Sequence, residues 1–117
     1  MGGRVILLEK KSFPGGNSVK ATSGINASES KAQKTLNIKD SNEVFEKDIA
    51  LSANKGVPGL DATDLQKTFV KESAPCIEWL ETSFGLDLSK VSRLGGHSFP
   101  RTHRGGEKFP GMAITYA

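Results

Sequence analysis

A carboxylate at the end of an apolar run is the first feature of this sequence that could do chemistry. The run is Val5-Ile6-Leu7-Leu8, and Glu9 follows it directly. Consecutive apolar residues without a polar break predict a strand buried on both faces, as in a parallel sheet. A carboxylate at the C-terminal end of such a strand can accept hydrogen bonds from both hydroxyls of a ribose. The alternative is an ordinary strand end that carries a glutamate.

A loop rich in glycine and short polar residues follows. Gly15-Gly16-Asn17-Ser18 combines a backbone that a ligand can approach closely with two side chains that can cap a helix. From Lys20 to Asn26 most side chains are small, so a flat ring could lie against the backbone amides. The spacing alone is equally compatible with an ordinary Gly-rich loop and a capped helix.

A second cluster of reactive side chains lies between Gly95 and Gly106. It contains four potential cations within eight residues: His97, Arg101, His103 and Arg104. Flanking glycines would let this loop bend around an anion. The alternatives are a solvated basic loop or a partner for acidic residues in a missing domain. The chain has one cysteine, so a closed four-ligand zinc site is not expected, and we predict no metal site.

Taken together, these motifs resemble a known family. The string from Val5 to Asn26, with Gly95 to Arg104, is similar to the flavoprotein of soluble fumarate reductases, most closely the fungal and protist type. The similarity runs through the whole chain. It implies an α/β fold: residues 1–117 as a partial, Rossmann-like FAD-binding domain with one clear parallel strand and a helical insertion. Relative to the family, the first strand and the Gly-rich phosphate turn are missing, and the chain is expected to be truncated at both ends.

The resemblance also assigns residues to the cofactor, FAD. It implies that Glu9 binds the adenosine ribose with Lys10 near the adenine edge, and that the Gly16 loop approaches the pyrophosphate and the flavin. A third group would border the isoalloxazine near N5 and the substrate. The cofactor-binding residues implied in this way are Glu9, Lys10, Gly16, Asn17, Ser18, Thr22, Ser23 and Gly24.

The activity implied by the resemblance is reduction of fumarate to succinate by hydride transfer from flavin N5. The family's catalytic arginine and its substrate clamps lie downstream of the stretch that matches Arg101 to Arg104, so no catalytic residue is assigned here. We therefore expect the 117 residues alone to be inactive. The alternatives are a fragment of a sister flavin dehydrogenase acting on aspartate, urocanate or a ketosteroid, or a non-catalytic remnant that binds an anionic partner. The sequence identifies neither the electron donor nor the compartment, cytoplasmic or mitochondrial.

Two helices must position these motifs. Asp40-Ser41-Asn42-Glu43 has the form of a capping box and predicts a helix over 41–53. Asp61 is the expected cap of a second helix that ends at Gly85, and Pro75 should kink it or divide it in two. Trp79 is expected to pack in the core or in a helix contact, and the alternative is a ring that stacks on a ligand. The apolar stripes at helical spacing are Phe45, Ile49 and Ala53 in the first helix, and Leu65, Phe69, Ile77, Leu80 and Phe84 in the second.

Composition excludes several classes of protein. The net charge is only +3, and clustered basic residues with interleaved aromatics are missing, so we expect no nucleic-acid partner. No apolar run reaches about 18 residues, so we expect no membrane span. With 36% hydrophobic residues and 13 glycines, the chain should build only a thin core.

Overall fold

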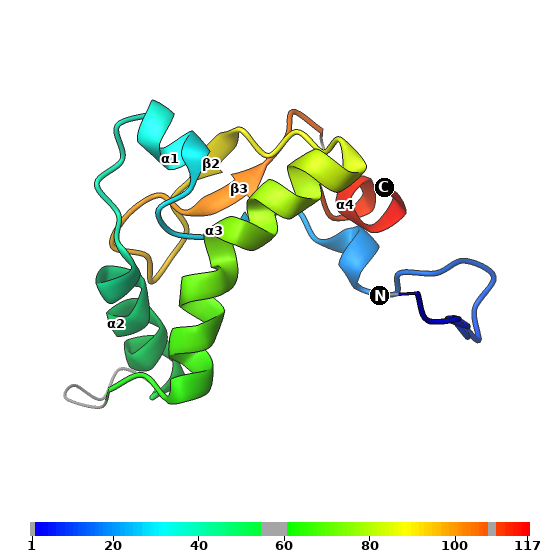
Figure 1. Ribbon diagram of the computed structural model, residues 1–117, viewed down its shortest axis with the longest axis horizontal. Coiled ribbons are helices and arrows are strands. Elements are labelled where there is room, and N and C mark those ends of the chain that lie inside the picture. The colour runs from blue at the N-terminus through cyan, green and yellow to red at the C-terminus, as the bar shows by residue number, and fades with distance from the viewer. Residues whose placement is uncertain (1, 55–60, 108–109) are drawn as a thin grey trace.

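The computed structural model of the chain describes residues 2–54, 61–107 and 110–117. Helices surround a small sheet, and the N-terminal segment projects from the body (Figure 1). The elements in chain order are η1 (Ser18–Lys20), β1 (Ile25–Asn26), α1 (Lys31–Thr35), α2 (Asn42–Ala53), α3 (Asp64–Phe84), β2 (Lys90–Ser92), β3 (Thr102–Arg104) and α4 (Pro110–Tyr116).

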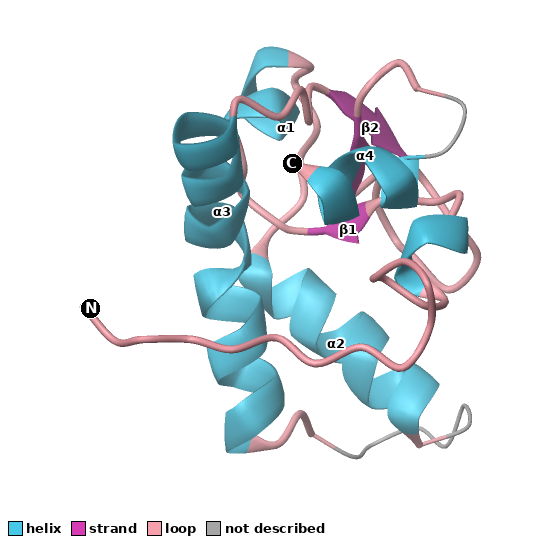
Figure 2. Cartoon of the chain, turned by 90° about the vertical axis from the view of Figure 1, so that its right-hand side faces the viewer, coloured by secondary structure: helices cyan, strands magenta, loops and turns pink. Residues whose placement is uncertain are grey.

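The sheet brings the two sequence motifs together. Its strand order is β1-β3-β2, and both pairs are antiparallel. His103 in the central strand lies opposite Ile25 on one side and Val91 on the other. Figure 2 shows the sheet beside α4, with the long helix α3 running past it. The loop after Gly15 is therefore held to the stretch around Arg101 by main-chain hydrogen bonds.

The predicted buried strand at Val5–Glu9 is wrong for this structure. Residues 2–14 contain no helix or strand, and Val5 to Leu8 are 81–89% exposed. A parallel strand is stable only between neighbouring strands, and none of the described residues pairs with this segment. The described fold is thus a mixture of helices and a small antiparallel sheet.

The helices occur where their patterns predict them, but their first residues differ. Ser41 caps α2 by accepting from the Val44 amide, in place of the predicted Asp40. Thr63 caps α3 in a capping box with Gln66, in place of Asp61. The predicted end at Gly85 is confirmed, because this residue adopts the left-handed conformation with φ 65°.

Helix α3 continues through Pro75 as one element, and its ribbon bends partway along its length (Figure 1). A proline removes one helical hydrogen bond, which explains a bend without a break. Its buried face consists of Val70, Ser73 and Ile77, so only part of the predicted stripe was right. Trp79 is 56% exposed, so it lies outside the core, and its ring packs edge-to-face on Phe84 of the same helix.

The apolar core is small, as the composition predicts. Ala27, Ile77 and Leu88 form its buried centre. The partly buried residues packed around them are Ile25, Leu80, Leu86 and Ile114. A separate contact joins α2 to α3, where Phe45 and Phe69 meet edge-to-face with ring centroids 6.1 Å apart.

A buried ion pair connects α2, its preceding loop and the sheet. Arg101, which has no exposed surface, donates to both carboxylate oxygens of Asp40, from Nε at 3.0 Å and from Nη2 at 2.8 Å. Its third nitrogen, Nη1, lies 2.9 Å from an Asp48 oxygen without the alignment of a hydrogen bond. The guanidinium also covers the Phe45 ring at 4.4 Å. Two carboxylates and an aromatic face thus compensate the desolvated charge.

We predict that Asp40→Ala lowers the free energy of unfolding by about 3–5 kcal/mol, because it leaves a buried guanidinium without its bidentate partner. Urea denaturation followed by circular dichroism would measure the change. The control is Lys31→Ala, which breaks the exposed Lys31–Glu78 pair and should have little effect. Equal effects of the two variants would contradict the assigned role of Arg101.

Candidate functional site

The loop that carries most of the predicted cofactor residues begins with two glycines in left-handed conformations. Gly15 has φ 106° and Gly16 has φ 48°. The turn then closes into η1, with the Ser18 amide donating to the Gly15 carbonyl at 2.8 Å. A Cβ atom at Gly16 would meet no atom within 4 Å, so the main chain there is open to a ligand.

Helix α4 supports this loop from behind. The Gly111 amide donates to the Ala21 carbonyl at 3.0 Å, and a Cβ atom at Gly111 would lie 2.2 Å from the Ser18 carbonyl oxygen. The Tyr116 hydroxyl donates to the Pro14 carbonyl at 3.0 Å. Glycine is therefore required where α4 meets the loop. A cavity of about 260 Å³ remains beside this contact, lined by Ser18, Ala21, Gly24, Ile25, Gly111, Ile114 and Thr115.

Strand β3 fixes the second half of the loop. Gly24 has φ 128°, and a Cβ atom there would lie 2.2 Å from the His103 carbonyl oxygen. The Thr102 hydroxyl donates to Asn26 Oδ1 at 2.7 Å, and Arg104 Nη1 approaches the Thr22 carbonyl at 3.5 Å. The backbone of 22–26 is thus held in one conformation by the strand behind it.

The polar side chains of the loop face outward. Asn17, Ser18, Thr22 and Ser23 are exposed, and within the described ranges their side chains make no hydrogen bond. Short unpaired hydroxyl and amide groups on a fixed backbone suit a ligand that is flat at one end and carries phosphates at the other. The residues present therefore fit FAD.

The structure separates the predicted site residues into two groups. Gly16 and Asn17 precede η1, Ser18 is its first residue, and Thr22 to Gly24 follow it in the same loop. Glu9 and Lys10 lie in the exposed segment before it, which projects from the body in Figure 1. There Glu9 accepts a hydrogen bond from the Lys11 amide at 2.9 Å.

The predicted anion-binding role of the basic cluster does not suit Arg101 or His103, because both side chains are buried. Arg101 is paired inside the chain with Asp40 and Asp48, so the acidic partners that the sequence analysis placed elsewhere are present here. Asp40 precedes α2 and Asp48 lies within it, and neither position by itself signals a partner 61 or 53 residues later.

His103 joins β3 to the start of α1. Its Nδ1 lies 2.8 Å from the Arg101 carbonyl, which can only accept, so Nδ1 carries the proton and Nε2 accepts from the Ser30 hydroxyl at 2.6 Å. Ser30 is also the cap of α1. Burial lowers the pKa of His103, and the Arg101 carbonyl only partly offsets this effect. Burial and the nearby Arg101 charge lower the pKa of His97.

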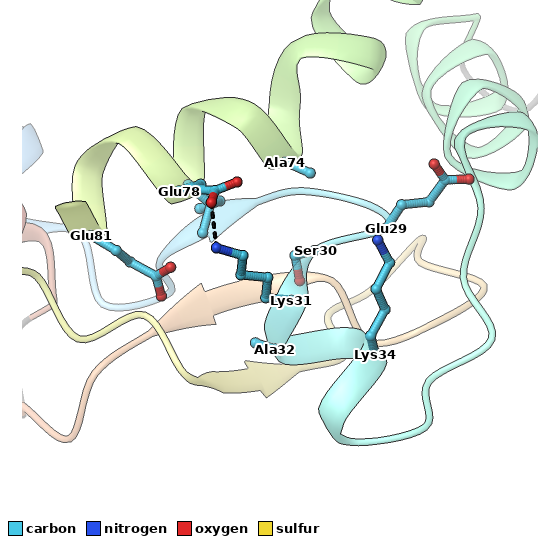
Figure 3. Close-up of a pocket in the computed structure, with 9 residues that line it drawn as sticks. Glu29, Ser30, Lys31, Ala32, Lys34, Ala74, Glu78 and Glu81 are labelled. Atoms are coloured by element: carbon cyan, nitrogen blue, oxygen red, sulfur yellow. Dashed lines mark hydrogen bonds and ion pairs between the residues drawn. The ribbon is translucent and has the colours of Figure 1, made fainter.

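A cavity of about 180 Å³ between α1 and α3 is lined by charges of both signs (Figure 3). Lys31 reaches across it to Glu78, while Lys34, Glu29 and Glu81 lie around its rim. Two lysines stand against three glutamates there, and Lys31 is already paired with Glu78, so the lining offers no concentration of one charge for an ionic substrate. In the part of the chain that the structure describes, no three acidic, histidine or cysteine side chains gather to hold a metal ion. None of the described helices is long and apolar enough to cross a membrane.

Comparison with known proteins assigns the family. The family model described as the FAD binding domain matches residues 1–117. The chain therefore belongs to the FAD binding domain family, and its cofactor is FAD. This confirms the resemblance found in the sequence.

The individual relatives are fumarate reductases. The chain is 45% identical over 106 residues to the fumarate reductase of Schizosaccharomyces pombe, covering 90% of this chain and 20% of that protein. It is 42% identical to fumarate reductase 1 of Saccharomyces cerevisiae, covering 91% and 22%. The solved open conformation of a flavocytochrome c3 fumarate reductase matches with a TM-score of 0.68 and 30% identity, over 85% of this chain and 17% of that one. The chain thus spans about a fifth of the length of these relatives.

Stability should depend on pH through His103. The pKa of His103 is lowered in the folded chain, so below the ordinary value of 6.5 the unfolded chain binds a proton more readily than the folded chain. The free energy of unfolding therefore has its full value above pH 6.5 and decreases as the pH falls from there through the lowered pKa. We predict that urea midpoints decline as the pH falls below about 6.5, and that His103→Gln reduces this slope.

The control for this prediction is His97→Gln. His97 has a lowered pKa but is less buried, so its replacement should remove a smaller part of the slope. If the full slope persists in His103→Gln, buried His103 is not its source.

Proposed function

We propose that this chain is the FAD-binding portion of a fumarate reductase whose complete form reduces fumarate to succinate. The observation that carries the proposal is the family match over the whole chain, together with a loop of fixed backbone that presents unpaired polar groups at Gly16–Gly24. When bound, the reduced flavin supplies the hydride from N5. We favour fumarate over aspartate, urocanate or a ketosteroid as the substrate because the two fungal relatives are named fumarate reductases.

In this proposal Thr22, Ser23 and Gly24 border the isoalloxazine. Their backbone is rigid because Gly24 packs against the His103 carbonyl and Ile25 pairs with β3. A preorganised backbone presents its groups to the ring without reorganising when the ring binds or reacts. Ser23 would act through its main chain, so removal of its hydroxyl should matter less than a change in backbone conformation.

Asn17 and Ser18 bind at the pyrophosphate and the flavin end in the same proposal. Gly16 supports this role, because its open side allows phosphate oxygens to approach the main chain closely. The Asn17 amide and the Ser18 hydroxyl would then donate to those oxygens.

Glu9 and Lys10 would bind the adenosine end, with the Glu9 carboxylate accepting from the ribose hydroxyls. Their segment packs against no core residue, so it is free to lie along a bound nucleotide. The one local bond of Glu9, from the Lys11 amide, is exposed and is exchanged readily for the ribose hydroxyls.

We predict that the purified chain binds FAD and that Glu9→Gln weakens this binding by about tenfold, because hydrogen bonds to a charged acceptor are lost. Quenching of flavin fluorescence would measure both affinities. FMN lacks the adenosine, so its affinity should be the same for the variant and the unaltered chain. Glu72→Gln, which removes an exposed carboxylate from α3, is the matched control. Equal loss of FAD and FMN affinity in Glu9→Gln would contradict the ribose role.

The proposed activity of the complete protein is tested by translating the genomic DNA on both sides of this reading frame. We expect a G-x-G-x-x-G sequence upstream, where the pyrophosphate would bind a helix N-terminus. Downstream we expect further histidines and arginines able to bind a dicarboxylate. A continuous reading frame that lacks both would contradict fumarate reduction by the parent.

A further inference from the structure

Two cations lie opposite each other in the small sheet. Arg104 of β3 pairs with Lys90 of β2, so their side chains leave the sheet on the same face. Like charges that are directly opposite destabilise a strand pair. Asp87 and Glu107 lie in the adjoining loops, yet within the described residues no carboxylate forms an ion pair with either cation. The sheet therefore carries an excess of positive charge at this position, which an anion would compensate.

Arg104 also adjoins the loop that is proposed to border the isoalloxazine. The register that pairs Ile25 with His103 places Gly24 opposite Arg104, on the other side of β3 from Lys90. A Cβ atom at Gly24 would lie 3.2 Å from the Arg104 Cβ atom, and Arg104 Nη1 lies 3.5 Å from the Thr22 carbonyl oxygen. The half-buried Arg104 side chain is thus held beside the main chain of residues 22–24.

A charge at this place distinguishes the oxidation states of a flavin. Uptake of two electrons from a donor and of one proton at N5 leaves a negative charge on the N1 and O2 side of the ring, whereas the oxidised ring is neutral. We propose that Arg104 stabilises the reduced form of the bound flavin over the oxidised form. The inference rests on the proposed function, which places Thr22, Ser23 and Gly24 along the isoalloxazine. A fixed cation beside those residues attracts the anionic ring more strongly than the neutral ring, so it raises the reduction potential.

The position of Arg104 favours the ring over the pyrophosphate as its partner. The proposed pyrophosphate contacts are Asn17, which precedes η1, and Ser18, which begins it. Arg104 instead approaches Thr22 and Gly24, which follow η1. The phosphates carry the same charge in both oxidation states, so a contact with them would not select the reduced flavin. The two roles therefore differ in a quantity that can be measured.

Removal of the charge tests the proposal. We expect Arg104→Gln to weaken the binding of reduced FAD about tenfold more than the binding of oxidised FAD, which is the size expected for two unit charges near a protein surface. For a two-electron couple this ratio lowers the midpoint potential by about 30 mV. Arg104→Lys keeps the charge and should keep most of the preference for the reduced form. Anaerobic redox titration of the 117-residue chain with FAD, with dithionite as the reductant and a reference dye, would measure the potentials.

The matched control is Lys71→Gln, which removes one exposed positive charge from α3 and should leave the potential unchanged. Without FAD, Arg104→Gln removes the repulsion between Arg104 and Lys90, so its urea midpoint should not fall below that of the unaltered chain. A purely structural role of Arg104 would lower this midpoint.

Three results would overturn the proposal. The first is an unchanged potential in Arg104→Gln. The second is an equal loss of affinity for oxidised and reduced FAD, because a phosphate contact would explain it. The third is an equal fall of the potential in Arg104→Lys, because that variant retains the charge. Failure of the unaltered chain to bind FAD in either oxidation state would contradict the proposed function itself, so the two kinds of failure are distinguishable.

Discussion

The burial of one arginine is the constraint on which the rest of this structure depends. Arg101 precedes the central strand, and it binds a carboxylate from the start of α2, another from within α2, and the Phe45 ring. With so small an apolar core, these charged contacts join the helical half of the molecule to the sheet. Removal of one partner would lower the free energy of unfolding by more than the intact ion pair contributes to it, because the remaining charge would be buried without a partner.

The same strand links this buried charge to the loop from Gly15 to Asn26. Thr102 and His103 follow Arg101 directly, and they hold Asn26 and Gly24 by a side-chain bond and by close backbone packing. The stretch that looked like an anion-binding loop therefore supports the loop from Gly15 to Asn26 from behind. Its buried basic residues act through packing and hydrogen bonds, while the short polar side chains of that loop are exposed.

Much of the fold could be predicted where the signal is local. The span of α2, the end of α3 at Gly85 and the Gly-rich loop follow from periodicity, backbone conformation and side-chain size. The predictions were wrong where the structure of a residue depends on partners far away in the sequence. Asp40 resembles a helix cap in sequence, but Arg101, 61 residues later, takes its carboxylate. Val5–Leu8 resembles a buried strand, but its burial requires neighbours that the described residues do not provide. The family could be recognised from motifs that extend over the whole chain.

The bond between Asn26 and Thr102 has a consequence for covalent modification. Asn26 begins an Asn-Ala-Ser sequence, which is the acceptor pattern for an N-linked glycan. In the folded chain its amide oxygen is held by the Thr102 hydroxyl, and the next two residues, Ala27 and Ser28, are at most 1% exposed. A transferase could attach sugar there only before the sheet forms.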